Sequence, residues 1–404
     1  MMKLAQERVL VSAAALAVAW LGGAASAEAL PRMSLTAGTP CSACHVNLQG
    51  GGMRTEIGWG SMSRVGAITY DDLGMESLHE QESNAWLDGR LAVGWDIRLQ
   101  MAKLGRPIRD DETGEVTTPD RSVIPMQIQP YLMAAPTDWL TLYGSYAMGP
   151  EISEGKLCKP RYAGQSCFDA EAILHAGSTA PALRVGLLQP SIGIRHDDHT
   201  MLIRGDATNR RAPIIAPNYA ELGAELSYHP MYWLQLELGG FRAKGLSEAL
   251  AGTPDVVGAS DLAISGRMQL MPRSDELKLN SWLGASFYGA GDFLLQNYFF
   301  GLGRMNLATL MFEVSRSTRD AASAHETLNG MLHLSVMPVD WLVIEGRAER
   351  ATSRVQGEDF TTESYVAGLQ FFPLPYVEIR PEYRYVKTNE YILGQYTVQL
   401  HTFF

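Results

Sequence analysis

From Ala85 to the last residue, apolar and polar side chains alternate with a period of two, in runs of about ten residues. The run from Val377 to Tyr385 shows this most clearly, because Glu and Arg occupy every even position between apolar or aromatic neighbours. Similar runs begin at Trp139, Trp233 and Leu342. A tilted strand of about ten residues can cross a bilayer with one face toward lipid and the other toward water. The pattern therefore predicts membrane-spanning β-strands.

Two kinds of connection separate these runs. Short turns that contain Pro precede a new run, often one that opens with Trp or Tyr, at residues 135–138, 229–231, 271–273, 337–340 and 372–375. The connections between them are longer and charged, at residues 103–121, 148–169, 189–217, 243–260, 317–324 and 350–360. Short turns at one end and long loops at the other are typical of outer-membrane barrels. We therefore expect an all-β fold, with residues 85–404 forming an antiparallel β-barrel of about sixteen strands.

The first residues have the features of an export signal. Lys3 and Arg8 precede an apolar run from Val9 to Leu21, and Ala25-Ser26-Ala27 has the form of a cleavage site. We interpret residues 1–27 as a secretory signal peptide, so the mature chain is expected to fold outside the cytoplasm. After residue 27 no stretch reaches about 18 consecutive apolar residues, which excludes a helical membrane protein.

Composition narrows the functional class further. The chain has 404 residues, a formal net charge of -11 and 19% charged side chains. Because affinity for phosphate backbones depends on clustered Lys and Arg, a nucleic-acid binder is excluded. Apolar and aromatic residues recur up to Phe404, so intrinsic disorder is excluded as well.

A cysteine motif near the start of the mature chain points to a cofactor. Cys41-Ser42-Ala43-Cys44-His45 has the spacing of c-type haem attachment, in which two thiols bind the porphyrin and the adjacent His binds the iron. A thioredoxin-like redox pair would need a strand before the motif, whereas Thr39-Pro40 stands there. A zinc site would need a further nearby ligand from another Cys or His pair. We expect one covalent haem c, with a redox or structural disulfide and a zinc site as the alternatives.

The other two cysteines suggest a structural role. Cys158 and Cys167 lie in a polar stretch that contains Lys, Pro, Arg and Gly. In an oxidising compartment this pattern favours a disulfide that closes a short exposed loop.

The haem motif lies in a short segment, residues 28–84, which is too small to form a stable core without a staple. We expect the haem to help fold this segment, and the segment to plug or cap the barrel lumen. Its sixth iron ligand stays open among Met53, Met62 and His79, so the coordination is either His/Met or His/His. For each of these side chains, ordinary packing or solvation is the more common role. His333 and His401 are expected to face the lumen because of their place in the alternation.

A second cluster of potential ligands lies in the long connection 189–217. His196-Asp197-Asp198-His199 offers two imidazoles and two carboxylates, which suit a transition metal. Ligands so close in sequence seldom all point at one ion. The alternatives are a solvated loop, or a constriction loop that folds into the lumen with its Arg side chains facing Glu on the opposite wall.

The C-terminal run adds a resemblance to a known family. Tyr396, Val398 and Leu400 alternate with polar residues and the chain stops on Phe404, which resembles the recognition signal of bacterial outer-membrane barrels. A signal peptide, one Cys-x-x-Cys-His motif and such a barrel together resemble the fused monohaem cytochrome c-porin family of the bacterial outer membrane, the Cyc2-like family. The likeness at residue level is confined to Ala29-Leu30-Pro31-Arg32 and the motif at 41–45.

The resemblance implies a function and partners. It implies electron transfer across the outer membrane through one haem, with an extracellular donor or acceptor, ferrous iron among the donors, and a periplasmic electron carrier such as a cytochrome. Oxidation of ferrous iron would then be the activity to test. Two other functions stay open: a passive or solute-selective porin, and a barrel that scaffolds a separate multihaem cytochrome.

Overall fold

The computed structural model describes residues 31–75, 84–104, 108–109, 116–117, 122–148, 166–177, 180–196, 198, 200–208, 214–216, 219–250, 257–258, 261–319, 325–390 and 392–404. The expected signal peptide, residues 1–27, lies outside this part of the chain. None of the helices within the described ranges combines the length and the apolar character needed to cross a membrane.

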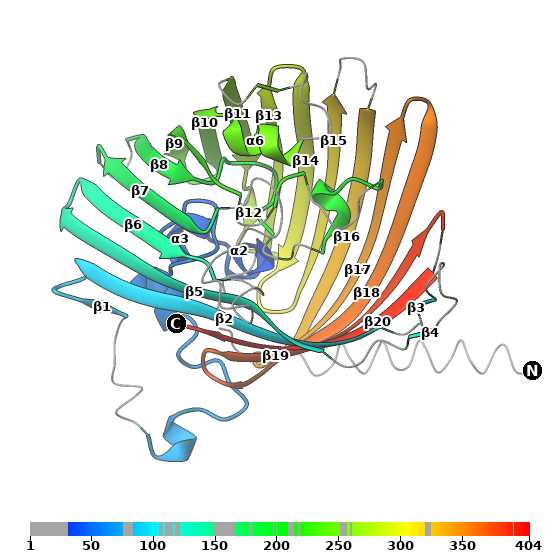
Figure 1. The fold of residues 1–404 in the computed structure, drawn as a ribbon. Coiled ribbons are helices and arrows are strands. Elements are labelled where there is room, and N and C mark those ends of the chain that lie inside the picture. The colour runs from blue at the N-terminus through cyan, green and yellow to red at the C-terminus, as the bar shows by residue number, and fades with distance from the viewer. Residues whose placement is uncertain are drawn as a thin grey trace, which may run out of the picture.

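Sixteen long antiparallel strands form a closed barrel (Figure 1). They are β2 (Leu91–Leu104), β5 (Ser122–Thr137), β6 (Leu140–Tyr146), β7 (Phe168–His175), β8 (Ala182–Leu188), β9 (Glu221–Met231), β10 (Leu234–Arg242), β11 (Leu262–Leu270), β13 (Leu279–Ala290), β14 (Phe293–Arg304), β15 (Ala308–Arg319), β16 (His325–Val339), β17 (Leu342–Val355), β18 (Glu358–Leu374), β19 (Val377–Thr388) and β20 (Ile392–Phe403). Each pairs with the next in this order, and β20 closes the barrel against β2, with Leu400 opposite Leu99. The predicted barrel of about sixteen strands is confirmed.

Four short strands complete the β structure. β1 (Ala85–Trp86) and β12 (Arg273–Ser274) extend the barrel sheet at the ends of β2 and β13, and β3 (Ile108–Arg109) pairs with β4 (Val116–Thr117) in a separate hairpin.

The alternation along the strands separates a lipid-type exterior from a polar interior. On β16 and β17, Leu332 and Ile344 are exposed on the outside, whereas Glu345 and Glu349 are buried on the inside. The predicted inward face of β19 is likewise confirmed, because Glu378 and Arg384 are buried there. An apolar outer wall and a polar inner wall are what a barrel in lipid requires.

The two ends of the barrel differ. Connections of two or three residues join β5 to β6, β9 to β10, β14 to β15, β16 to β17 and β18 to β19, at the end where β2 begins and β20 stops. In outer-membrane barrels the end with the short turns faces the periplasm. At the opposite end, the prediction of a long loop at 350–360 is wrong, because β17 and β18 continue through these residues. They meet in a turn of Gln356 and Gly357, with φ of 51° and 89°. Two left-handed residues make a tight hairpin turn that matches the twist of the strands.

Helices of the N-terminal segment lie at the periplasmic end of the barrel, and α2 (Pro31–Ala37) lies inside it. α2, α3 (Cys41–Cys44), α4 (Glu56–Gly60) and the 3₁₀ turn η1 (Asp71–Leu73) belong to the segment before β1. α2 packs on the inner faces of β13, β14 and β15, and Figure 1 shows it within the barrel outline. Leu35 of α2 is fully buried against Trp282, Phe299 and Met311 of the wall.

The connections at the other end also enter the lumen. The connection between β8 and β9 carries the 3₁₀ turn η3 (Leu202–Arg204), which packs on β15, β16 and β17. α6 (Lys244–Ala249) follows β10. Together they form an apolar core with the wall strands, made of Leu188, Ile192, Ile214, Ile215, Tyr219, Phe241, Leu246, Leu250, Tyr288, Phe293 and Leu295 among others. The lumen on the β9 to β14 side is therefore filled by packed side chains.

Candidate functional site

The Cys-x-x-Cys-His motif forms one helical turn inside the barrel. α3 spans Cys41–Cys44, and His45 is its C-cap residue, whose backbone N–H donates to the Cys41 carbonyl at 3.0 Å. Pro40 precedes the turn with extended backbone angles, which suits the start of a helix. Cys41 and Cys44 are both free thiols, and His45 is only 3% exposed. The turn thus places two partly buried thiols next to a buried imidazole.

A glycine run lets the chain pass close to this turn. Gly50 has a φ of +87°, and a Cβ added there would lie 3.3 Å from Cys41 Cβ and 3.8 Å from His45 Cδ2. Gly52, with a φ of +65°, approaches the barrel wall, where an added Cβ would be 2.8 Å from the Tyr143 hydroxyl. These positive φ values and close approaches favour Gly over any residue with a side chain.

α4 supports the motif from the other side. Thr55, its N-cap residue, donates from its backbone N–H to the Cys44 carbonyl at 3.1 Å and from its hydroxyl to the Ala43 carbonyl at 2.7 Å. The same hydroxyl accepts from the Gly58 N–H at 3.2 Å. A Cβ on Gly58 would lie 2.0 Å from the Cys44 carbonyl oxygen. The two short helices are therefore in direct backbone contact.

The donor set of this turn fits a covalently attached haem. Burial raises the pKa of both thiols, Cys41 and Cys44, so each is protonated at neutral pH when it has no bonding partner. Two reduced cysteines three positions apart, followed directly by a His, are the groups that haem c attachment needs. Cys41 and Cys44 would hold the porphyrin, and His45 would bind the iron.

The expected sixth ligands lie in apolar clusters. Met53 is fully buried with Val46, Tyr131, Tyr143 and Ile173, and its backbone carbonyl accepts from the Val46 N–H at 3.0 Å. Met62 is buried with Trp59, Val65 and Tyr376. His79 lies outside the residues that the structure describes. The sixth ligand therefore stays a prediction. Of the three candidates, Met53 is the nearest to the motif in sequence.

The connection 189–208 folds into the lumen, as the constriction-loop alternative expected. Gly193, with a φ of +53°, donates from its N–H to Ser286 Oγ at 2.7 Å, and its carbonyl accepts from Arg267 Nε at 3.0 Å. Arg204 donates to the loop's own carbonyls at Ile192 and Ile194. Asp198 and Asp206 of the loop contact the wall residues Arg347 and Arg319.

The candidate metal ligands of this loop face different partners. His196 Nε2 lies 3.0 Å from Glu313 Oε2, whereas Asp198 Oδ2 lies 3.0 Å from Arg347 and 3.4 Å from Arg384. Asp197 and His199 lie outside the described residues. Within the described part of the chain, no three His, Cys, Asp or Glu side chains form a group that could hold a metal ion. A metal site at His196 and His199 stays a prediction.

Asp206 fastens the far end of the loop. Its carboxylate lies 3.2 Å from Arg319 and 3.0 Å from His325, and accepts from Ser353 Oγ at 2.7 Å. Burial acts to raise the pKa of Asp206, but the hydrogen bonds from His325 and Ser353 outweigh it and hold the pKa well below its usual range. Asp206 is therefore a charged anchor in the lumen.

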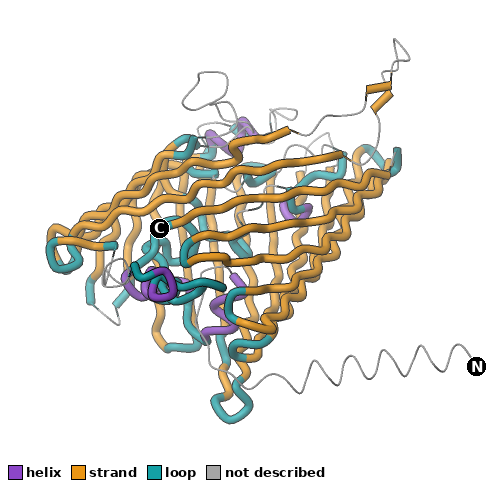
Figure 2. The backbone as a smooth tube through the Cα atoms, turned by 90° about the horizontal axis from the view of Figure 1, so that it is seen from below, coloured by secondary structure: helices purple, strands orange, loops and turns teal. Residues whose placement is uncertain are grey.

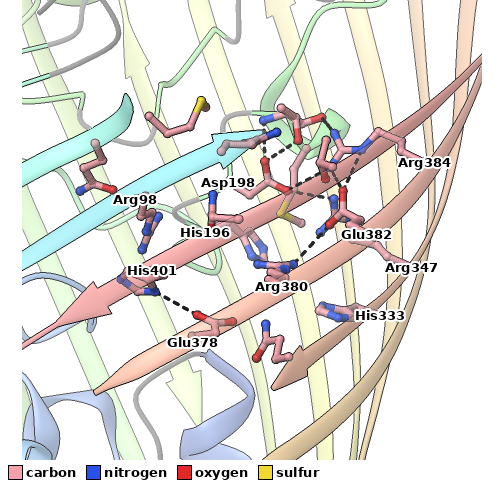
Figure 3. Close-up of a pocket in the computed structure, with 18 of the residues that line it drawn as sticks. Arg98, His196, Asp198, His333, Arg347, Glu378, Arg380, Glu382, Arg384 and His401 are labelled. Atoms are coloured by element: carbon pink, nitrogen blue, oxygen red, sulfur yellow. Dashed lines mark hydrogen bonds and ion pairs between the residues drawn. The ribbon is translucent and has the colours of Figure 1, made fainter. Parts of the chain in front are cut away.

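A polar cavity of about 160 Å³ remains between the N-terminal segment and this loop (Figure 3). Arginines from several strands line it together with His333 and His401, whose lumen-facing positions were expected from the alternation. His401 lies between two carboxylates, with Nδ1 2.9 Å from Glu378 and Nε2 2.8 Å from Asp96. Sequence reasoning missed this group because Asp96 and Glu378 lie on β2 and β19, the two strands that flank β20. The closure of the barrel alone brings them together.

The predicted disulfide is described in part. Cys167 is disulfide-bonded, and Cys158, its expected partner, lies outside the described residues.

Comparisons with known proteins identify the fold. The architecture is that of outer-membrane porins: the loop-deleted form of OmpT from Vibrio cholerae has 9% identity and a TM-score of 0.52, over 78% of this chain and 99% of that one. The anion-selective porin from Comamonas acidovorans has 11% identity and a TM-score of 0.52, over 78% and 99%. OprB of Pseudomonas putida has 11% identity and a TM-score of 0.53, over 83% and 97%.

No family model matches the chain, and no curated protein matches it in sequence. At these identities the likeness concerns the fold. With its apolar exterior, the chain is an outer-membrane β-barrel of the porin type, and its predicted place in the bacterial outer membrane is confirmed.

Proposed function

We propose that this protein transfers electrons across the outer membrane through one haem c attached to Cys41 and Cys44, with His45 as the proximal iron ligand. The observation that carries the proposal is the α3 turn, which presents two partly buried free thiols next to the buried His45. When bound, the haem supplies a one-electron redox centre. The protein's part is to position that centre and to tune its potential.

The surrounding residues perform these two tasks. α4 fixes the backbone of the motif through Thr55 and Gly58, so the orientation of the attached group is set by two helices and not by a loose loop. His45 is buried, and the apolar clusters around Met53 and Met62 keep water away from it. A less polar environment favours the oxidation state of the redox centre that carries less charge. An extracellular donor or acceptor and a periplasmic electron carrier are the partners of this proposal, with ferrous iron as the donor to test first.

The filled lumen supports electron transfer over open diffusion. The N-terminal segment occupies the periplasmic mouth, and the connection 189–208 and α6 fill part of the rest. Sixteen-strand porins otherwise leave an aqueous channel. Here a polar cavity of about 160 Å³ lies between the N-terminal segment and the connection 189–208.

A solute-selective porin is the second candidate. The porin fold and the cavity lined by Arg98, Arg380 and Arg384 favour it. In this alternative the Cys-x-x-Cys-His segment would serve only as a structural plug.

The first experiment is haem staining of denatured outer membranes, followed by reduced-minus-oxidised spectra. The wild type is expected to carry a covalent c-type signal that Cys41→Ser and Cys44→Ser abolish. Cys167→Ser is the matched control, because it removes a cysteine far from the motif and should keep the signal. A wild-type barrel of normal abundance without haem would contradict the proposal and favour the porin.

A further inference from the structure

α4 contacts the motif with one side and presents an exposed apolar side chain on the other. Its inner side touches the motif, since Gly58 packs on the Cys44 carbonyl and Trp59 is buried. Its outer side presents Ile57, a large apolar side chain that is 68% exposed. Figure 2, seen from below, shows helical turns at the end of the barrel where the C-terminus lies. α4 therefore links the motif to an exposed apolar side chain at the periplasmic end.

A second exposed apolar side chain lies beside α4. Leu87 is 72% exposed in the turn before β2. This turn lies beside α4, since a Cβ added at Gly89 of the turn would be 3.6 Å from Glu56 Oε1 of α4. Leu87 and Asp88 have φ values of 55° and 57°, the left-handed conformation of the hairpin turn that joins β1 to β2. The turn presents the Leu87 side chain outward.

Acidic groups surround these two apolar side chains. Glu56 and Asp88 are exposed beside them. Among the described residues 56–75, the exposed charges are Glu56, Asp71 and Asp72 against one cation, Arg64. The nearby Arg90 is engaged with Asp138 at 3.1 Å. An apolar centre with an acidic rim is suited to brief contact with a basic protein surface.

We propose that the α4 surface, defined as Glu56, Ile57, Leu87 and Asp88, docks a small soluble redox protein whose own docking face is basic. The inference rests on the proposed function, because it gives the attached haem its periplasmic partner. The acidic rim steers the partner electrostatically, and Ile57 and Leu87 provide the small apolar contact. Redox encounters of this kind bury little area, so binding is weak, fast and dependent on salt.

The test measures binding to the full-length holoprotein in zwitterionic lipid nanodiscs. The probe is mitochondrial-type cytochrome c, a small basic protein, and its lysine-succinylated form serves as the acidic counterpart. Empty nanodiscs give the background. At low salt the wild type should bind the basic probe and not the succinylated one. The double variant Glu56→Lys with Asp88→Lys should weaken binding about tenfold or more, and Ile57→Ser several-fold.

A matched control lies in the turn between β11 and β13, at the same end of the barrel but on its opposite side. There Leu277 is 60% exposed and follows Glu276, so Glu276→Lys with Leu277→Ser makes the same kind of change. This variant should bind the probe like wild type. Equal losses in both places, or no preference of the wild type for the basic probe, would overturn the docking surface.

The two proposals fail in different ways. Binding needs no electron transfer, and the haem content of each preparation is measured separately by staining. Absence of haem in the wild type would overturn the proposed function whatever the binding result. A haem-loaded protein whose binding is unchanged in the α4-surface variants would overturn the docking surface alone.

Discussion

At the residue scale, the proposed haem site depends on how closely the chain packs around Cys41, Cys44 and His45. The motif itself is evident from the sequence, since its spacing has one principal use in an exported protein. Its support is not. Gly58 stands in a sequence with many glycines, and only the folded chain shows that a side chain there would meet the Cys44 carbonyl oxygen at 2.0 Å.

Replacement of Gly58 tests this contact. In an exposed helix, Gly→Ala stabilises by roughly 0.5–1 kcal/mol, but overpacking against backbone costs about 1–3 kcal/mol, so Gly58→Ala should push α4 off the motif. We expect a several-fold lower fraction of chains with covalent haem and faster proteolysis of residues 31–75. Gly60→Ala, in the same helix with no atom within 4 Å of the added Cβ, is the control. Equal haem content in the two variants would contradict the role of this contact.

At the element scale, the strands of the barrel could be predicted from the sequence, whereas the segments that fold into its lumen could not. The period of two gave the inward faces of β17 and β19 correctly because lipid and water impose opposite demands on adjacent residues. The same alternation continues through 350–360, where the charged side chains predict a loop but belong to β17 and β18. The inward fold of 189–208 rests on pairs such as Asp198 with Arg347, 149 positions apart, which no local pattern encodes.

The anchor of that loop gives a second prediction. Asp206→Asn keeps the shape of the side chain but removes its charge, leaving Arg319 and His325 without their buried carboxylate partner. Loss of such a partner costs about 3–5 kcal/mol, so the loop should detach from β15 to β17 and the single-channel conductance in planar bilayers should rise. Asp359→Asn breaks an exposed pair with Arg354 at the β17–β18 turn and should leave the conductance unchanged. An unchanged conductance in Asp206→Asn would show that the loop is held by other contacts.

The pH dependence of this anchor follows from its lowered pKa. Because the pKa of Asp206 is lower in the folded protein than in the unfolded chain, its stabilisation is fully present above the unfolded value, about pH 4. The stabilisation is lost only as the pH falls through the lowered folded value. Protonation of Asp206 should therefore not open the wild-type loop at neutral or mildly acidic pH.

At the scale of the whole molecule, the N-terminal segment and the barrel form one packed body. Trp59 stacks on Tyr376 with ring centroids 5.3 Å apart, and Phe404 lies edge-on to Trp59 with ring centroids 5.8 Å apart. Phe404 in turn pairs with Trp95 across the junction of β2 and β20, with N–O distances of 2.9 and 3.2 Å. The segment that carries the motif thus contacts the place where the barrel closes, which fixes the motif relative to the membrane.

The most direct test of the central claim is electron transfer across a sealed membrane. Proteoliposomes would enclose mitochondrial-type cytochrome c, and ascorbate would be added outside as the reductant. Wild type should reduce the enclosed cytochrome much faster than the haem-free double variant Cys41→Ser with Cys44→Ser, which keeps the same barrel. If the haem-free barrel reduces the enclosed cytochrome equally fast, ascorbate itself crosses the lumen. That result would contradict electron transfer through the haem and establish a porin.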